Sequence, residues 1–354
     1  MSLDINALLR LAVKSNASDV HLSVSRRPTL RIKGELRPVA ELDVLTPEHM
    51  QDMFTVLTSK EQRETFFKYK ELDFAYSLSD FGRFRVNAYF QRGTMALAIR
   101  VLQAVIPTME ELGLPAVCRD LVTKPRGLVL VTGATGTGKS TSLAAMIGYL
   151  NTTVSKRVVT IEDPIEFVHT DNKCYIVQRE VGSDTHSFAD ALRHALRQDP
   201  DVILLGEMRD LETMRVGLTA AETGHLVLGT LHTPNAAQTI DRIIDIFPAQ
   251  QQPQIRTQLA LALEGVMSQV LLPRADGKGR VAAFEIMLAT NAIRNLIREA
   301  KTHEIPNYIL LGRQEGMCLM DRALAELVRK GLVLRDDALA KAINPKTFSV
   351  SSAE

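Results

Sequence analysis

The sequence has no tryptophan, few aromatic residues and only three cysteines. Phe, Tyr and Trp together make up 5% of its 354 residues. Cys118, Cys174 and Cys318 lie far apart and form no CxxC pair. This spacing argues against a disulfide framework and against a zinc site. Isolated cysteines of this kind are typical of proteins in a reducing compartment such as the cytoplasm.

The sequence also lacks a long hydrophobic run and an excess of either charge. No stretch of 18 apolar residues occurs, so we expect no transmembrane helix. The first residues include Asp4 and do not have the basic start and apolar run of a signal peptide. Lys and Arg number 42 and Asp and Glu number 41, for a net charge of +1. We therefore expect a cytoplasmic protein whose contact with a membrane goes through other proteins, and overall charge gives it no affinity for nucleic acid.

The length and the spacing of apolar residues predict two domains. In residues 1–102, Ile5, Leu8, Leu9 and Ala12 recur at helical spacing, and several short strand patterns follow, which predicts a small α+β domain. Residues 103–126 are rich in proline and glycine and are expected to be a linker with a short helix near residues 109–112. Residues 127–354 would form the second domain.

The second domain shows the pattern of an α/β fold. Apolar strand patterns alternate with longer helical patterns, and the strands are expected at Leu128–Thr132, Val158–Ile161, Val202–Leu205 and Leu226–Leu231. Continuous apolar strands of this kind favour a mainly parallel sheet covered by helices on both faces. From about Pro248 onward the chain reads as mostly helical.

The strongest motif is the segment GATGTGKS, which fits GxxxxGK[ST] in full and lies between a predicted strand and a predicted helix. Glycines let successive backbone N–H groups point at one anion, and the start of the helix adds partial positive charge. Lys139 would reach the β- and γ-phosphates of ATP, and Ser140 would hold Mg²⁺. The predicted nucleotide-binding residues are Gly133, Ala134, Thr135, Gly136, Thr137, Gly138, Lys139, Ser140 and Thr141.

Acidic residues follow two of the predicted strands. Glu162, Asp163 and Glu166 follow the strand at Val158–Ile161, and Glu207 follows the strand at Val202–Leu205. Because ligands of open α/β sheets bind outside the carboxyl ends of the strands, these acids are expected near the phosphates. Hydrolysis needs one carboxylate to orient water and another to help hold Mg²⁺. Glu207 is predicted to be the Mg²⁺-binding acid of a Walker B motif, and Glu166 or Glu162 would position the water.

Two histidines bracket the last of these strands. His225 precedes Leu226–Leu231 and His232 follows it. His232, at the carboxyl end, is a candidate sensor of the γ-phosphate. His225 lies at the other end of the strand, and the spacing alone favours a structural role for both.

The order of these motifs resembles the secretion ATPases of type II secretion and type IV pili. The carriers are GATGTGKS, TIEDPIE, DVILLGEMRD and TGHLVLGTLHT, together with ASDVHL near the N-terminus. The segment AIRNLIRE at residues 292–299 is similar to one characteristic of pilus retraction ATPases. A tetracysteine zinc motif, which assembly and secretion ATPases commonly carry, is missing. By periodicity alone, residues 292–299 form an amphipathic helix that buries Ile293, Leu296 and Ile297 and turns Arg294 and Arg298 outward.

This resemblance implies a PAS-like N-terminal domain joined to a RecA-like ATPase domain. It implies a homohexamer that is cytoplasmic and held at the inner membrane by a pilus platform protein, with a paralogous pilus ATPase as a further partner. Glu166 becomes the favoured catalytic acid, and both histidines become functional candidates. Arginines of the N-terminal domain would reach the nucleotide and neutralise charge in the transition state, and the candidates are Arg83, Arg85 and Arg100, with Arg126 before the phosphate loop.

Three other interpretations remain open from the sequence. A nucleic-acid translocase on the same fold is disfavoured by the net charge of only +1, the scarce aromatic residues and the lack of a recognisable nucleic-acid module. A nucleotide-binding switch without catalysis is disfavoured by the presence of Glu166 and Glu207. A pilus assembly or type II secretion ATPase, or an auxiliary retraction paralogue, differs from a retraction motor only in the partner and direction of its work.

Overall fold

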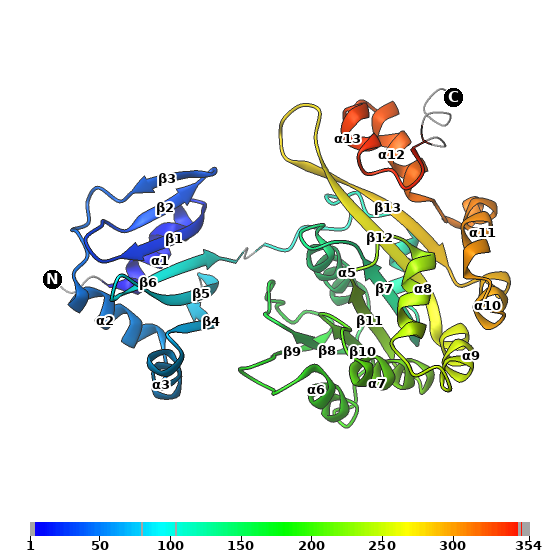
Figure 1. Ribbon diagram of the computed structural model, residues 1–354, viewed down its shortest axis with the longest axis horizontal. Coiled ribbons are helices and arrows are strands. Elements are labelled where there is room, and N and C mark those ends of the chain that lie inside the picture. Colours follow the sequence, from blue (N-terminus) through cyan, green and yellow to red (C-terminus); the bar gives the residue numbers. More distant parts are fainter. Residues whose placement is uncertain (1–3, 79–80, 103–104, 346–347, 349–354) are drawn as a thin grey trace. The chain divides into compact units, whose positions relative to one another are not determined.

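The computed structural model describes residues 4–78, 81–102, 105–345 and 348. The chain divides into two compact units, one made of Met1–Val105 with Glu166–Val168 and the other of Ile106–Ile165 with His169–Glu354 (Figure 1). Residues 103–104 of the expected linker lie outside the described residues, and residues 106–126 group with the second unit. The helix in this stretch is α4 (Val117–Val122), whereas residues 109–113 form turns.

The first unit is built on a six-stranded antiparallel sheet with the strand order β3-β2-β1-β6-β5-β4. Its strands are β1 (Ala17–Ser23), β2 (Thr29–Ile32), β3 (Glu35–Pro38), β4 (Glu71–Leu78), β5 (Gly82–Gln91) and β6 (Thr94–Val101). Its helices are α1 (Ile5–Lys14), α2 (Pro47–Leu57) and α3 (Lys60–Tyr69). The four apolar residues predicted to share a helix face are the four that α1 buries. The α+β character of this region is confirmed.

The second unit is built on a seven-stranded sheet with the order β13-β12-β7-β11-β10-β8-β9. Its strands are β7 (Gly127–Thr132), β8 (Arg157–Glu162), β9 (Tyr175–Glu180), β10 (Val202–Leu205), β11 (Leu226–Leu231), β12 (Leu263–Pro273) and β13 (Arg280–Leu288). All neighbouring strands are parallel except β12 and β13, which form an antiparallel pair. The predicted mainly parallel α/β sheet is therefore confirmed.

Helices cover both faces of this sheet. The helices are α5 (Lys139–Thr153), α6 (Phe188–Ala195), α7 (Leu211–Glu222), α8 (Ala236–Asp245), α9 (Gln252–Ala262), α10 (Asn291–Arg298), α11 (Ile305–Leu311), α12 (Met320–Arg329) and α13 (Arg335–Leu339). The helices α6 through α11 pack on one face of the sheet and share one apolar core with it. The helices α4 and α5 pack on the other face and form a second core. Because both faces of the sheet are covered, a central strand can be buried at every position, as β7 and β11 are, and its residues are mostly apolar.

The expectation that the chain is mostly helical after Pro248 is wrong for residues 263–288. These residues form the long hairpin of β12 and β13, which extends beyond the sheet and packs against α12 and α13 (Figure 1). Their apolar residues are buried on both faces along much of the hairpin. A strand of this kind lacks the alternation of period two that distinguishes a strand from a buried helix in sequence.

Helix α10 buries Ile293, Leu296 and Ile297, as its periodicity predicts. Arg294, however, does not turn outward as expected. Its guanidinium donates to the main-chain oxygens of Ala260 and Leu261 at the end of α9 and to the Glu264 carboxylate. In the part of the chain that the structure describes, no helix has both the length and the apolar character needed to cross a bilayer.

Candidate nucleotide-binding site

The phosphate loop connects the carboxyl end of β7 to the start of α5, as predicted. Gly133 has φ of 144°, and a Cβ atom there would lie 2.4 Å from the Gln269 main-chain oxygen and 2.8 Å from Thr137 Oγ1. Gly138 precedes the first residue of α5 and has φ of 90°. Only glycine tolerates this conformation together with such close neighbours. The sequence pattern therefore corresponds to a sharply curved loop that ends at a helix N-terminus.

Lys139 lies against this loop. Its side chain is buried, and Nζ donates hydrogen bonds to the main-chain oxygens of Gly133 at 2.9 Å and Ala134 at 3.1 Å. Residues 134–136 are exposed, and so is Ser140 in the first turn of α5. An exposed loop, a lysine ammonium and a helix N-terminus are the groups from which proteins build a site for a phosphate chain.

Glu207 follows β10 and is held from two sides. Its Oε1 lies 3.2 Å from His232 Nε2, and its Oε2 lies 2.6 Å from Arg209 Nη2. Burial would raise the pKa of Glu207, but the hydrogen bond and charge of Arg209, with a smaller contribution from His232, hold this pKa below its usual value. The carboxylate is therefore ionised at neutral pH, which suits a ligand of Mg²⁺.

Strand β11 connects this carboxylate to the phosphate loop. The Leu231 main-chain oxygen accepts from the N–H of Gly133 at 3.3 Å, and His232 follows Leu231 directly. Thr230 donates to the main-chain oxygen of Gly206, and its own main-chain oxygen accepts from the N–H of Met208 at 3.1 Å. Glu207, His232, Lys139 and Ser140 thus lie at the same edge of the sheet.

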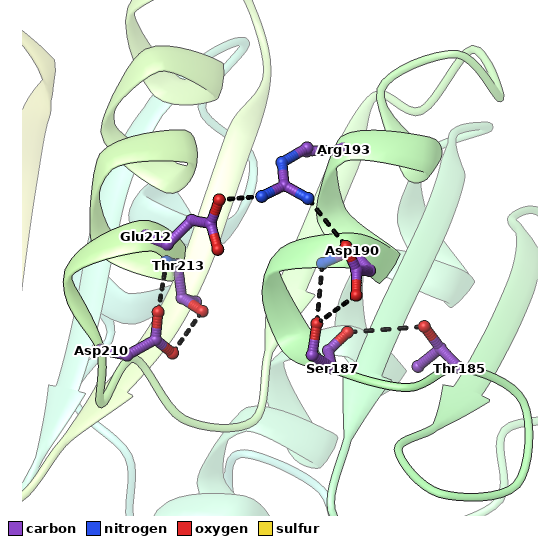
Figure 2. A network of polar contacts seen from close by, with 7 residues as sticks. All are labelled: Thr185, Ser187, Asp190, Arg193, Asp210, Glu212 and Thr213. Atoms are coloured by element: carbon purple, nitrogen blue, oxygen red, sulfur yellow. Dashed lines mark hydrogen bonds and ion pairs between the residues drawn. The ribbon is translucent and has the colours of Figure 1, made fainter.

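A polar network fixes the segment that follows Glu207 (Figure 2). Asp210 caps α7 by accepting from the N–H and the hydroxyl of Thr213, at 2.8 and 2.7 Å. Arg193 of α6 pairs with Asp190 and reaches across to Glu212 in the first turn of α7. The network ties α6 to α7 immediately after Arg209, so both ends of the segment that carries Glu207 are anchored.

The two candidate water-positioning acids have different surroundings. Glu162 ends β8, where its Oε1 accepts from Thr160 Oγ1 at 2.6 Å and from Gln178 Nε2 at 3.0 Å. β8 is the neighbour of β10, and the N–H of Gly206 donates to the Ile161 oxygen at 2.8 Å. Glu162 therefore lies beside the Glu207 segment. Glu166 is exposed and, by its contacts, groups with the first unit.

Two predicted site residues lie at the opposite edge of the sheet. The main-chain oxygen of His225 accepts from the N–H of Gly127 at the amino end of β7, and its ring Nδ1 is 3.1 Å from the Ala220 oxygen. Arg126 directly precedes Gly127 and is exposed. Six strand residues at about 3.3 Å each separate this edge from the phosphate loop, or roughly 20 Å. The structure does not bring Arg126 or His225 to the loop of their own chain.

The candidate arginines of the first unit lie on neighbouring strands. Arg85 of β5 is directly opposite Arg100 of β6, and Arg100 is opposite Asp19 of β1. Asp19 Oδ1 lies 3.2 Å from Arg100 Nε, so this arginine is already paired. Arg83 shares the strand face of Arg85, since residues two apart on a strand point the same way.

Sequence reasoning missed Arg209. Arg209 lies two residues beyond Glu207 and pairs with it, although its side chain is 67% exposed. One signal could have suggested this pair. Arg209 is a basic residue two positions after an acid at the end of a strand, in a segment without helical periodicity.

Comparison with known proteins agrees with this geometry. The family model for type II/IV secretion system proteins matches residues 1–331. The chain is 49% identical to the type IV pilus retraction ATPase PilT of Pseudomonas aeruginosa, over 98% of this chain and 100% of that protein. It is 47% identical to a twitching motility protein of Neisseria gonorrhoeae, over 91% and 86% of the two chains.

Among solved structures, the pilus retraction motor PilT with bound ADP is similar with a TM-score of 0.91. The two chains are 46% identical, and 98% of each is covered. The family match over residues 1–331 includes the phosphate loop, the Glu207 segment and His232. This chain therefore belongs to the family of type II/IV secretion system proteins.

Proposed function

We propose that this chain hydrolyses ATP to power the retraction of type IV pili. The observation that supports this function most is the likeness over nearly the whole chain to a pilus retraction ATPase. The phosphate loop and the Glu207–His232 pair, both at one sheet edge, are the chemistry that such a motor requires.

The loop from Gly133 to Gly138 would bind the phosphates through its N–H groups, and Lys139 would exchange its loop carbonyls for phosphate oxygens. Ser140 and Glu207 offer a hydroxyl and an ionised carboxylate, which are ligands that Mg²⁺ prefers. When bound, Mg²⁺ would neutralise charge on the β- and γ-phosphates. His232, in contact with Glu207, would respond to the γ-phosphate through that carboxylate.

Water attack on the γ-phosphate needs an acid that orients the water. We assign this to Glu166, with Glu162 as the alternative that lies beside Glu207. Arg83, Arg85 and Arg100 would stabilise the charge of the transition state. Arg100 would first have to leave Asp19, so Arg85, whose side chain is exposed, is the arginine of the three best suited to meet an anion directly.

Movement would arise because the γ-phosphate binds one arrangement of the two units better than another. We propose that ATP draws the first unit of one subunit onto the nucleotide of its own or a neighbouring subunit, with a hinge in the linker. A homohexamer would pass this closure from one subunit to the next around a ring. A platform protein would hold the ring at the inner membrane, and a paralogous ATPase would be a further partner. Identical solution scattering with and without a nonhydrolysable ATP analogue would contradict this mechanism.

The reaction is tested with the purified chain. Phosphate release should require both ATP and Mg²⁺, and Lys139→Ala should lower it by about 100-fold or more because a phosphate contact made in the transition state is lost. Stimulation by DNA would instead support a nucleic-acid translocase. Nucleotide binding with no turnover in an assembled ring would support a regulatory switch.

The direction of work is tested in cells. The gene is deleted in its native host, and fluorescently labelled pili are imaged. Pili that extend but never shorten, with shortening restored by the wild-type gene and not by Lys139→Ala, are the expected result. Cells without pili would identify an assembly ATPase. Pili that retract normally would leave this chain only an auxiliary role in retraction.

A further inference from the structure

Strand β12 runs beside the phosphate-loop strand and places one buried amide under the loop. β12 is parallel to β7, with Ser268 opposite Thr132, the last residue before the loop. The next residue of β12 is Gln269, whose side chain is 2% exposed. A glutamine is seldom so deeply buried unless its amide is fully hydrogen-bonded.

The Gln269 amide joins the loop to the helix that follows it. Its Nε2 donates to the main-chain oxygen of Thr137 within the loop. Its Oε1 accepts from Ser142 Oγ at 2.8 Å in the first turn of α5. The preceding residue, Ser268, shares a 2.8 Å hydrogen bond with Thr132 Oγ1 before the loop. β12 thus contacts the segment before, within and after the loop.

The bond to Thr137 constrains the direction of one N–H group of the loop. Because the peptide bond is planar and trans, the Thr137 oxygen and the Gly138 N–H point in opposite directions. Holding the oxygen toward Gln269 therefore turns the Gly138 N–H away from β12. Gly133 and Gly138 allow this packing, since a Cβ at Gly138 would lie 3.1 Å from Gln269 Nε2.

We infer that Gln269 is a positioning residue that holds the phosphate loop in the curvature that binds nucleotide. This inference rests on the proposed ATPase function and assigns to that site a residue from the hairpin strand. The amide provides both the donor for Thr137 and the acceptor for Ser142 from one planar group, which neither an apolar side chain nor a carboxylate can do. Without it, the loop occupies the binding conformation for a smaller fraction of the time, and apparent affinity falls by that fraction.

The test compares three variants by the dissociation constant of a fluorescent ADP analogue and by steady-state ATP hydrolysis. Gln269→Leu removes both hydrogen bonds. Gln269→Glu keeps the acceptor for Ser142 but places a carboxylate oxygen against the Thr137 oxygen, which repels it. Each should raise the dissociation constant and KM by about tenfold, while kcat at saturating ATP stays within about threefold, because bound ATP restores the loop. Ser142→Ala removes one hydroxyl and should raise the dissociation constant by about threefold, with no further loss when combined with Gln269→Leu.

Asn151→Leu is the matched control. Asn151 is a buried amide at the far end of the same helix, and it donates to Thr170 and accepts from Asn172 and Cys174. This variant should lower Tm but keep the dissociation constant within about twofold, because its bonds lie away from the loop.

Unchanged affinity in Gln269→Leu, or in Ser142→Ala if the glutamine variants do not fold, would overturn the inference. A loss of affinity in Asn151→Leu as large as that in Gln269→Leu would overturn it as well, since general destabilisation would then explain both. Failure of the wild-type chain to bind the ADP analogue would instead contradict the proposed function.

Discussion

Glu207 and His232 meet across the carboxyl ends of two neighbouring strands, with 3.2 Å between Oε1 and Nε2. β10 and β11 are paired in parallel, so the residues that follow them reach the same edge of the sheet. Arg209 holds the second carboxylate oxygen of Glu207. The acid is oriented from both sides, and its partner histidine directly follows the residue that contacts the phosphate loop.

His232→Ala should slow ATP hydrolysis more than it weakens nucleotide binding. The substitution removes a hydrogen bond to a partly buried carboxylate, a contact typically equivalent to about 1.5–3 kcal/mol. We expect kcat to fall by about 10- to 100-fold and the dissociation constant for ADP to change by less than about threefold. Phosphate release measures the slower turnover, and titration with a fluorescent nucleotide measures the dissociation constant.

The surface pair His303 and Glu304 provides the control for this experiment. Their closest atoms are 3.8 Å apart, and the His303 side chain is 76% exposed. His303→Ala should leave kcat unchanged, because an exposed pair contributes little. Equal losses in the two variants would show that the Glu207 contact is not specific to catalysis.

Gly133→Ala should abolish nucleotide binding. Its Cβ would collide with the Gln269 oxygen, which is main chain and cannot move aside as a side chain would. Gly277→Ala, in the turn between β12 and β13, tests backbone strain alone, since φ there is 69° and no atom lies within 4 Å of the added Cβ. We expect the second variant to bind ADP normally with a stability loss of about 1 kcal/mol. Normal ADP binding by Gly133→Ala would contradict the curvature described for the loop.

The elements with a clear period or a specific motif were predicted well from sequence. The strands β10 and β11 have the predicted bounds. The phosphate loop is identifiable because its backbone needs glycine at fixed positions, and few sequences have glycines at that spacing. Glu207 and His232 were selected because they follow apolar strands, and the parallel pairing then brings them together.

Gln269 and Arg294, which the sequence did not place, depend on contacts between distant segments. Gln269 lies in a strand that was read as helix, because β12 is buried on both faces and shows no alternation. Arg294 was expected to face solvent, since an arginine on an amphipathic helix usually does, but the end of α9 lies within its reach. Neither the pairing of β12 with β7 nor the end of α9 is visible in local periodicity.

Glu285 should give the protein a pH-dependent stability of unusual sign. It is buried in β13, where it accepts from the N–H groups of Ala236 at 2.8 Å and Met320 at 3.2 Å. Burial raises its pKa, and these two bonds offset only part of that effect. A carboxyl whose pKa is raised on folding contributes stability that is present below the unfolded pKa and is lost as pH rises through the folded pKa.

The free energy of unfolding of the wild type, relative to that of Glu285→Gln, should therefore fall as pH rises from about 4 to 8. Glu326→Gln in α12 is the control of opposite sign, because Arg329 and Lys330 lower the pKa of Glu326. Relative to that variant, the wild type should gain stability as pH rises toward about 4.3, the ordinary pKa of glutamate, and change little above it. Urea unfolding at several pH values measures both differences, and equal slopes would contradict the role given to burial.

Arg294→Ala should destabilise the second unit, whereas Arg298→Ala, on the same helix, should not. The Arg294 side chain is 18% exposed and donates to the oxygens of Ala260 and Leu261 and to Glu264, so its loss removes three hydrogen bonds at the partly buried end of α9. We expect a loss of about 2–3 kcal/mol for Arg294→Ala and less than about 0.5 kcal/mol for Arg298→Ala. Arg294→Lys should recover only part of the loss, because a lysine cannot reach three acceptors in the fixed geometry of a guanidinium. Urea unfolding decides between this packing role and a solvent-facing arginine, for which both alanine variants would unfold like the wild type.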